Sequence, residues 1–384
     1  MAAGSRQSIR KRAETPLQPK SIITDAFSKR LCQWFRENQR PLPWRLNPTP
    51  YRVWISEIML QQTQAKTVIP YYNRFLRHFP NVSSLALASE ETILTLWSGL
   101  GYYNRARNLL RAARQIVKFH DGIFPTDYKT VLSLPGIGRY TAGAICSIAL
   151  HQPQPIVEGN IRRVLTRLKG IRKFIPEKFF WDQMSAWIPD REASIFNQAI
   201  MELGATVCLP TQPLCSQCPV RTFCGAKRKN LQNTIPLPRP RKRVDNVEIL
   251  ILVLRHKTKI LLTRQENSFI PGLWGFPYGE VLPGQSTAES ADRLSKRLFG
   301  VAMSIESRTA VRHSITNHRI LAHIFTGEIK KTDLLSHKKS TRIQWANDLQ
   351  LRRLLTSSLF RKALAHVSHR VSQRGGANRD LQEV

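Results

Sequence analysis

The sequence predicts a multidomain protein in which an all-α domain is followed by an α+β domain. At 384 residues the chain is long enough for about two to three domains. From about Ile22 to Leu209, apolar residues recur at spacings of three and four, which is typical of amphipathic helices. From Val247 the pattern changes to short apolar stretches that predict strands, with one amphipathic helix over 288–299.

Basic and proline-rich segments mark the expected boundaries between these parts. The first twenty residues are basic and polar, which is typical of a disordered arm. A later segment combines three prolines with a basic cluster, as semi-stiff linkers do. The predicted order is a basic arm (1–20), a helical domain (21–230) with a helix-hairpin-helix (128–149) and a cysteine loop (208–224), a linker (231–246), an α+β domain (247–359) and a polar tail (360–384).

Charge is the extreme feature of the composition. The chain has 59 Lys and Arg against 26 Asp and Glu, a formal net charge of +33. Such an excess attracts polyanions and favours nucleic acid as the partner, although a purely structural nucleic-acid protein would share it. The sequence contains no apolar stretch of about 18 residues and no secretory signal, so we expect no membrane association. We expect a bacterial, nucleoid-associated cytoplasmic protein, or a nuclear or mitochondrial one in a eukaryote.

Four of the six cysteines lie close together, with the spacing C-x6-C-x2-C-x5-C. Four thiolates so close in a cysteine-poor chain suit either tetrahedral zinc or a [4Fe–4S] cluster, and the spacing alone leaves both open. The two isolated cysteines, Cys32 and Cys146, lie on apolar helical faces and are expected in the core. The predicted ligands are Cys208, Cys215, Cys218 and Cys224.

The segment LSLPGIGRYTAGAIC (132–146) predicts a helix, a tight turn and a second helix. Gly136 and Gly138 are expected to adopt backbone conformations closed to other residues and to leave the amides of the turn unshielded. The free N–H groups at the start of the second helix then point toward an anion. The hairpin is therefore expected to bind DNA phosphate without reading bases.

Three segments together resemble the MutY-type adenine DNA glycosylases of the helix-hairpin-helix superfamily. They are LPGIGRYTAGA (134–144), WISEIMLQQTQ (54–64) and GLGYYNRARNL (99–109). The resemblance covers roughly residues 22 to 357. It implies excision of adenine opposite 8-oxoguanine or guanine in double-stranded DNA, during base excision repair. It also implies a [4Fe–4S] cluster at the four cysteines, a monomer, and replication or repair proteins as partners.

Glu57 is the expected general acid. We place it near the start of a helix, on one face with Trp54 and Gln61. An acid among apolar groups has a raised pKa and can hold a proton near neutrality, which suits protonation of the leaving adenine. Without the resemblance, Glu57 would be interpreted as a solvated helix residue.

The resemblance assigns three DNA contacts and one diagnostic position. Gln61 and Gln62 match the family's glutamine pair near the intercalation point, and Tyr102 matches the aromatic wedge beside the damaged guanine. Such a wedge offsets part of the unstacking cost when adenine is flipped out. Tyr140 occupies the position of the Schiff-base lysine of bifunctional relatives, so the chain is expected to be monofunctional and to leave an abasic site.

Glu158, in PIVEGNIRRVLTR (155–167), departs from the family, in which this position is aspartate. A carboxylate there stabilises the positive charge that develops on the sugar. Glutamate keeps the charge but adds a methylene, and a misplacement of about 1 Å can cost about a hundredfold in rate. Asn160 matches the asparagine that helps to orient the site. The alternative is that the Glu158 carboxylate merely satisfies backbone amides at a helix start.

The segment FIPGLWGFPYGEV (269–281) and the helix after it resemble a Nudix hydrolase domain. When the family's metal-binding box is laid from Gly279, the required acids are missing, so we expect no metal and no Nudix hydrolysis. The positions where acids are needed hold Gln285, Leu294, Arg297 and Leu298.

In the glycosylases this domain reads 8-oxoguanine through a short loop, which corresponds here to HSITNHR (313–319). Thr316 keeps a hydroxyl, whereas Ile315 and Asn317 depart from the usual phenylalanine and histidine. The alternative is a domain with a structural role only.

Two further functions compete with a monofunctional adenine glycosylase. A thymine or uracil mismatch glycosylase of the same superfamily would share the hairpin and the cysteines, but the C-terminal domain argues against it. A mismatch-binding protein that has lost catalysis through Glu158 is the second alternative.

Overall fold

The computed structural model describes residues 22–238, 243–266, 269–300, 304–315, 317–329 and 342–375. The basic arm predicted over 1–20 and Thr316 lie outside these ranges. The chain forms two compact units. The first comprises the described residues up to Val53 together with Thr126–Leu132 and Ile137–Pro238, and the second comprises Trp54–Pro125, Ser133–Gly136 and the described residues from 243 onward.

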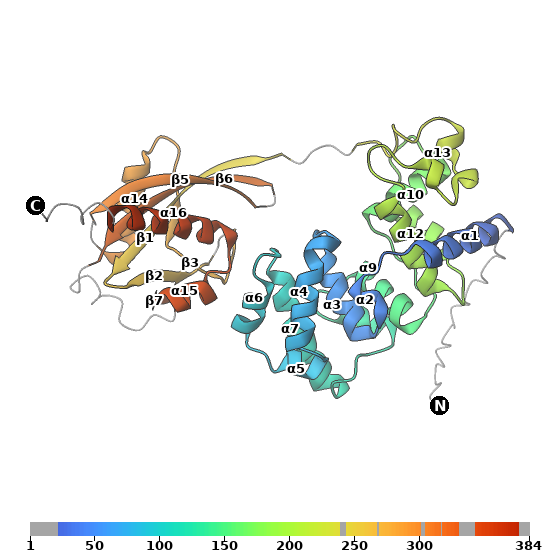
Figure 1. Cartoon of the computed structure of the whole chain (residues 1–384), viewed down its shortest axis with the longest axis horizontal. Coiled ribbons are helices and arrows are strands. Elements are labelled where there is room, and N and C mark those ends of the chain that lie inside the picture. The colour runs from blue at the N-terminus through green and yellow to red at the C-terminus, as the bar shows by residue number, and fades with distance from the viewer. Residues whose placement is uncertain are drawn as a thin grey trace, which may run out of the picture. The chain divides into compact units, whose positions relative to one another are not determined.

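The predicted all-α part is confirmed, because the described residues up to Pro238 contain helices and no strand (Figure 1). The helices are α1 (Ile22–Asn38), α2 (Pro43–Leu46), α3 (Pro50–Leu60), α4 (Ala65–His78), α5 (Val82–Ala86), α6 (Glu90–Trp97), α7 (Asn104–His120), α8 (Tyr128–Ser133), α9 (Arg139–Ala144), a π-helical turn (Ile145–Ala149), α10 (Gly159–Lys169), α11 (Glu177–Trp187), α12 (Ala193–Thr206) and α13 (Gly225–Arg228), with 3₁₀ turns at Cys215–Gln217 and Arg221–Phe223.

The C-terminal part is α+β, as predicted, and the structure shows that its sheet is mixed. The central strand β1 (Asp245–His256) pairs in parallel with β6 (His318–Glu328), and the remaining pairs are antiparallel. The strand order is β3-β2-β1-β6-β5, with β4 on β1 and β7 on β2. The other strands are β2 (Lys259–Arg264), β3 (Trp274–Gly275), β4 (Tyr278–Glu280), β5 (Ile305–Ile315) and β7 (Ile343–Ala346).

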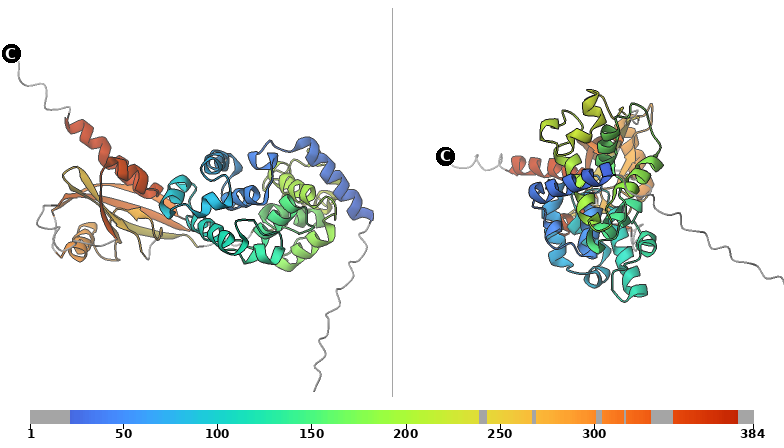
Figure 2. Two further views of the ribbon diagram at one scale, coloured as in Figure 1. Left: turned by 90° about the horizontal axis from the view of Figure 1, so that it is seen from below. Right: turned by 90° about the vertical axis from the view of Figure 1, so that its right-hand side faces the viewer.

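The sheet is covered on both faces, because β1 has apolar side chains on both sides. Its continuous apolar run buries Ile249, Ile251 and Val253 in one cluster and the alternating leucines in another. Helix α14 (Thr287–Phe299) packs on the leucine face, and α15 (Asp348–Leu354) and α16 (Ser358–Gly375) pack on the other. Figure 2 shows α14 in orange and α16 in red on opposite faces.

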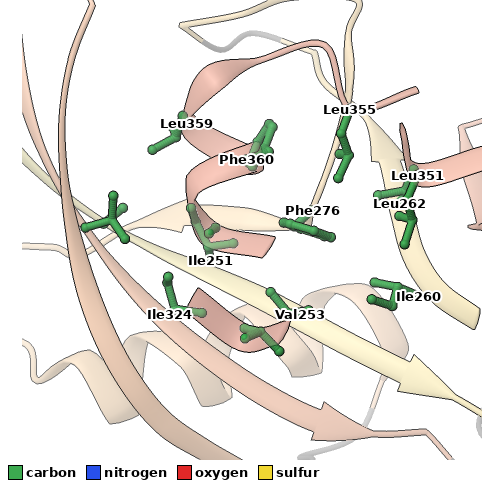
Figure 3. Close-up of a cluster of buried hydrophobic side chains, with 14 of the residues drawn as sticks. Ile251, Val253, Ile260, Leu262, Phe276, Ile324, Leu351, Leu355, Leu359 and Phe360 are labelled. Atoms are coloured by element: carbon green, nitrogen blue, oxygen red, sulfur yellow. The ribbon is translucent and has the colours of Figure 1, made fainter. Parts of the chain in front are cut away.

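The predicted polar tail over 360–384 is wrong for its first part, because α16 continues to Gly375. Phe360, Ala363 and Val367 are buried in one hydrophobic cluster, and their spacing of three and four places them on one helix face. Figure 3 shows Phe360 within this cluster. Gly275 makes room for this helix, since a Cβ there would lie 1.9 Å from Phe360 Cε2. No helix in the described ranges is both long and apolar enough to span a membrane.

Candidate active site

The proposed acid lies in an apolar part of the second unit. Glu57 is 6% exposed, and its neighbours Trp54 and Ile58 are also buried. It lies in the second half of α3, so the prediction of a position near the helix start is wrong. The helix begins earlier, at Pro50, and proline is favoured in a first turn because its missing N–H has no partner there anyway. Gln61 follows the last residue of α3 and therefore does not share a helix with Glu57.

The two predicted DNA-contacting segments both contain non-glycine residues with left-handed backbone. Gln62, in the turn after α3, has φ +58° and is exposed. Tyr102, in the loop before α7, has φ +50°, and its side chain is 43% exposed. Such conformations are strained for residues with a side chain and concentrate at functional sites. Both loops are therefore held in shape by their surroundings rather than by local preference.

The hairpin residues separate into two cases. Gly136 has φ +79°, and a Cβ there would lie 2.6 Å from Asn108 Cβ, so this position needs glycine on both counts. Gly138 has extended backbone, φ −93° and ψ 177°, so the prediction of a conformation closed to other residues is wrong at this position. It is the residue before α9, and the space around it is open, which leaves the amides of the turn accessible.

Tyr140 lies in the first turn of α9 and is half-buried. Its hydroxyl donates to Met201 Sδ on α12 at 3.3 Å. The side chain at this position thus ends in a phenol held against α12, and it carries no amine.

Glu158 is the residue immediately before α10. Both of its carboxylate oxygens accept backbone hydrogen bonds, Oε2 from Asn160 N at 2.8 Å and Oε1 from Ile161 N at 2.9 Å. This is the arrangement of a helix cap, in which an acid satisfies free amides and interacts favourably with the helix dipole. Asn160 Oδ1 accepts from Arg163 Nη2 at 2.6 Å, and its Cβ packs against Gly204 of α12.

The four predicted ligands line one cavity between the cysteine loop, α10 and α12. All four are free thiols. Arg167, on α10, donates to Cys208 Sγ at 3.4 Å and to the carbonyls of Leu209 and Pro210. Burial raises the pKa of Cys218 to about 12, and the neighbouring thiols add to this effect. As the side chains stand, no group of three or more His, Cys, Asp or Glu among the described residues could hold a metal ion.

A hollow of about 530 Å³ lies within the second unit. The wedge loop contributes Gly99 to Tyr103, and the sheet contributes His313, Ser314 and Ile315 at the end of β5. Its volume is that of a small-molecule site, for which about 300–1,000 Å³ is usual. Of the predicted lesion-loop residues, Ile315 lines this hollow, and Asn317 donates instead to Asp245 Oδ2 at 3.2 Å. Thr316 lies outside the described residues.

Two positions at which the Nudix box needs acids have other surroundings in the structure. Leu294 is buried in the leucine-face core, and Gln285 Oε1 accepts from Ser290 Oγ at 3.3 Å. Neither position offers a carboxylate to a cation.

Comparison with known proteins identifies the family. Residues 55–189 match the model of the HhH-GPD superfamily base excision DNA repair proteins. The adenine DNA glycosylase of Buchnera aphidicola from Acyrthosiphon pisum is 39% identical over 257 residues, which are 65% of this chain and 73% of the relative. That of Schizosaccharomyces pombe is 31% identical over 81% of both chains. The chain belongs to the adenine DNA glycosylase family. The family and the enzyme class predicted from the sequence are confirmed.

One solved structure supports the helical fold of this adenine DNA glycosylase. A thermostable thymine-DNA glycosylase is 27% identical, covers 54% of this chain and 97% of its own, and has a TM-score of 0.51. The MutT protein of Methanosarcina mazei is 20% identical over 35% of this chain, with a TM-score of 0.29. The helical fold is thus shared with a thymine-DNA glycosylase, the competing type of enzyme. The relatives found by sequence are adenine DNA glycosylases.

Sequence reasoning missed two buried charged groups. Glu202, on α12, is 1% exposed and forms ion pairs with Arg40 at 2.7 Å and Arg45 at 2.9 Å. Burial opposes ionisation, but the hydrogen bonds from the two arginines lower the pKa of Glu202 to about 2. Arg105, in the first turn of α7, is 8% exposed, and burial lowers its pKa to about 10. In both cases a charged residue interrupts an apolar helix face, which the sequence shows, but the sequence does not show that the charge is buried or what its partners are.

Proposed function

We propose that this adenine DNA glycosylase removes adenine paired with 8-oxoguanine or guanine and leaves an abasic site. The hollow of the second unit carries the proposal. This hollow is lined by the loop that carries the proposed wedge, Tyr102, and by the end of β5, where the lesion loop begins. A site of this size can take the base opposite the flipped adenine. Loss of the Nudix acids favours recognition over hydrolysis in the C-terminal part.

Glu57 acts in this proposal as the general acid. Its side chain is buried on α3, as are Trp54 and Ile58 beside it. Adenine leaves poorly as an anion, so a proton delivered to the departing base lowers the barrier. The conservative variant Glu57→Gln keeps the shape and removes the proton.

Glu158 acts as the counter-charge for the oxocarbenium-like sugar. Each carboxylate oxygen accepts one amide hydrogen bond, which fixes its position while leaving further acceptor capacity. A fixed anion is what electrostatic stabilisation of a developing cation requires. The competing interpretation, a helix cap without a catalytic role, rests on the same two hydrogen bonds, so only a rate measurement separates them.

Tyr140 makes the proposed enzyme monofunctional. A phenol cannot form a Schiff base, so strand cleavage by β-elimination has no amine at this position. The released products are adenine and an abasic site whose strand is intact.

The four cysteines are proposed to hold a [4Fe–4S] cluster, and the residues present fit it. The cavity is lined by four thiols with no carboxylate or imidazole, a sulfur-only set that suits iron–sulfur or zinc. Burial raises the pKa of the Cys218 thiol, so this thiol ionises readily only when a cation is bound. When bound, the group would cross-link the loop between Cys208 and Cys224 and would shape its basic surface. Iron near four atoms per chain in anaerobically purified protein supports the cluster, and stoichiometric zinc without iron contradicts it.

The proposed partner is double-stranded DNA with A:8-oxoguanine or A:G mismatches, bound by a monomer. Replication or repair proteins are further proposed partners. The proposed location is the bacterial cytoplasm or, in a eukaryote, the nucleus or mitochondrion.

Single-turnover base release tests the function directly. Duplexes carry A opposite 8-oxoguanine, A opposite G, and T opposite G. Release of adenine from the first two supports the proposal, and release of thymine supports the superfamily alternative. Tight binding to the first two without release indicates a mismatch-binding protein.

A further inference from the structure

Arg105 joins the two segments that carry the proposed acid and the proposed wedge. Its Nη1 donates to the carbonyls of Ile58, Met59 and Gln61, at 2.9, 2.9 and 2.5 Å. Its Nη2 donates to the carbonyls of Leu100 and Gly101, at 3.0 and 3.1 Å. The first three carbonyls belong to the end of α3 and the turn after it, and the last two belong to the wedge loop.

An arginine is specifically suited to this position. The last carbonyls of a helix have no intrahelical partner and form the negative end of its dipole, so a cation at the end of α3 is favourable. The planar guanidinium offers five N–H donors in a fixed fork, whereas a lysine offers three on a flexible stem. No ion pair of Arg105 occurs within the described part of the chain, so its charge is balanced by backbone carbonyls and aromatic rings.

Two aromatic rings also contact the Arg105 guanidinium. The guanidinium carbon lies 5.4 Å from the ring centroids of both Trp97 and Tyr102. Trp97 Nε1 also donates to the Gly101 carbonyl at 3.1 Å. One buried cation therefore contacts Tyr102 itself and the carbonyl of Gln61, the residue before the strained Gln62.

We propose that Arg105 is a positioning residue that fixes the Tyr102 wedge relative to helix α3, and so couples wedge insertion to protonation of the flipped adenine by Glu57. The inference rests on the proposed function, since it takes the wedge and acid roles from it. Release of this cation would let the two loops relax from their left-handed conformations independently. Left-handed backbone is strained for residues with a side chain, so both loops would move toward unstrained conformations.

A double-mutant cycle tests the coupling. Arg105→Lys, Tyr102→Ala and the double variant are compared with the unaltered chain for single-turnover adenine release opposite 8-oxoguanine. We expect Arg105→Lys to lower the rate by about 10- to 100-fold, because a displacement of about 1 Å has effects of that size. In the Tyr102→Ala background the further loss should be less than about threefold. Independent, multiplicative losses in the two backgrounds would overturn the proposal.

Two further variants separate positioning from general destabilisation. Arg74 also stacks on a tyrosine, 4.8 Å from the Tyr71 ring, and donates to the Leu96 carbonyl at 3.0 Å, but it contacts neither loop. Arg74→Lys should therefore keep the rate within about twofold. If Arg105→Lys does not fold, Gly101→Ala replaces it in the cycle. Gly101 has φ +69° with nothing within 4 Å of a Cβ, so this change strains the wedge loop without a clash.

A measurement of base extrusion tests the role of Arg105 separately from the proposed function. Fluorescence of 2-aminopurine in place of the target adenine reports extrusion of the base without base release. Arg105→Lys should lower the fluorescence gain on binding, and Arg74→Lys should not. If the unaltered chain extrudes the base but releases no adenine, the proposed function fails and the positioning role is still measured. An unchanged gain in Arg105→Lys would overturn the positioning role even if the enzyme is active.

Discussion

Replacing Glu202 by glutamine should destabilise the helical part strongly at neutral pH and weakly in acid. The carboxylate is 1% exposed and holds Arg40 and Arg45 through ion pairs at 2.7 and 2.9 Å. Its pKa falls from an ordinary value of 4.5 to about 2. At about 1.36 kcal/mol per pKa unit, this difference corresponds to about 3 kcal/mol of folding free energy. Breaking a buried ion pair by removing one partner costs about 3–5 kcal/mol, which agrees in size.

The sign of the pH dependence follows from the direction of the pKa change. Because the folded state has the lower pKa, ionised Glu202 stabilises the protein above pH 4.5, the ordinary value. That contribution is lost as the pH falls from 4.5 toward 2, where the folded state also takes up the proton. The difference in unfolding free energy between the unaltered chain and Glu202→Gln should therefore shrink across this window.

Urea unfolding followed by far-ultraviolet circular dichroism measures both quantities, at pH 7 and at pH 3. The matched control is Asp182→Asn on α11, which removes an exposed (i, i+4) pair with Lys178 at 2.6 Å. That change should cost less than about 0.5 kcal/mol. A loss for Glu202→Gln below about 1 kcal/mol at pH 7, or an equal loss at both pH values, would refute the reasoning.

Three further predictions concern the proposed chemistry. Glu158→Gln should slow single-turnover adenine release by several hundredfold, about 3–4 kcal/mol, while Glu158→Asp keeps or raises the rate; full activity of the glutamine variant contradicts the counter-charge role. The unaltered chain should give no borohydride-trapped DNA adduct, and trapping would contradict the monofunctional role assigned to Tyr140. Cys215→Ser should weaken DNA binding in a gel-shift titration more than it slows base release by the bound fraction, because the basic loop loses its shape; the reverse order would contradict this.

The fold could be predicted from the sequence wherever hydrophobic periodicity was strong. The run ILILVL in β1 is apolar at every position because both of its faces are covered, and this pattern predicted a strand. Strand β5 was missed because it pairs only with β6 at one edge of the sheet, and its sequence IESRTAVRHSI is largely polar. Helix α16 was missed because basic residues lie between its buried positions, and such a sequence is also typical of a polar tail.

The site could be predicted only in part, for a different reason. Glu57, Tyr102 and the four cysteines stand in segments whose residue types point to chemistry, and the resemblance named their roles. A conformation such as that of Gly138 is not encoded by residue type, because glycine permits extended backbone as readily as left-handed backbone. The residue alone could not distinguish it from Gly136, whose φ of +79° is fixed by the turn.

Arg105 and Glu202 show what the sequence leaves out. Each lies on an amphipathic helix at a position where an apolar residue would also fit the period, and burial of a charge is expensive unless its partners are in place. The partners of Glu202 lie more than 150 positions away along the chain, and those of Arg105 are backbone carbonyls, which carry no residue signal. Burying the charge of Arg105 is costly. The geometry of the site explains this cost, because Arg105 holds the two strained loops. The loops around Arg105 are therefore the part of this enzyme in which substitutions remote from the reacting atoms should change the rate most.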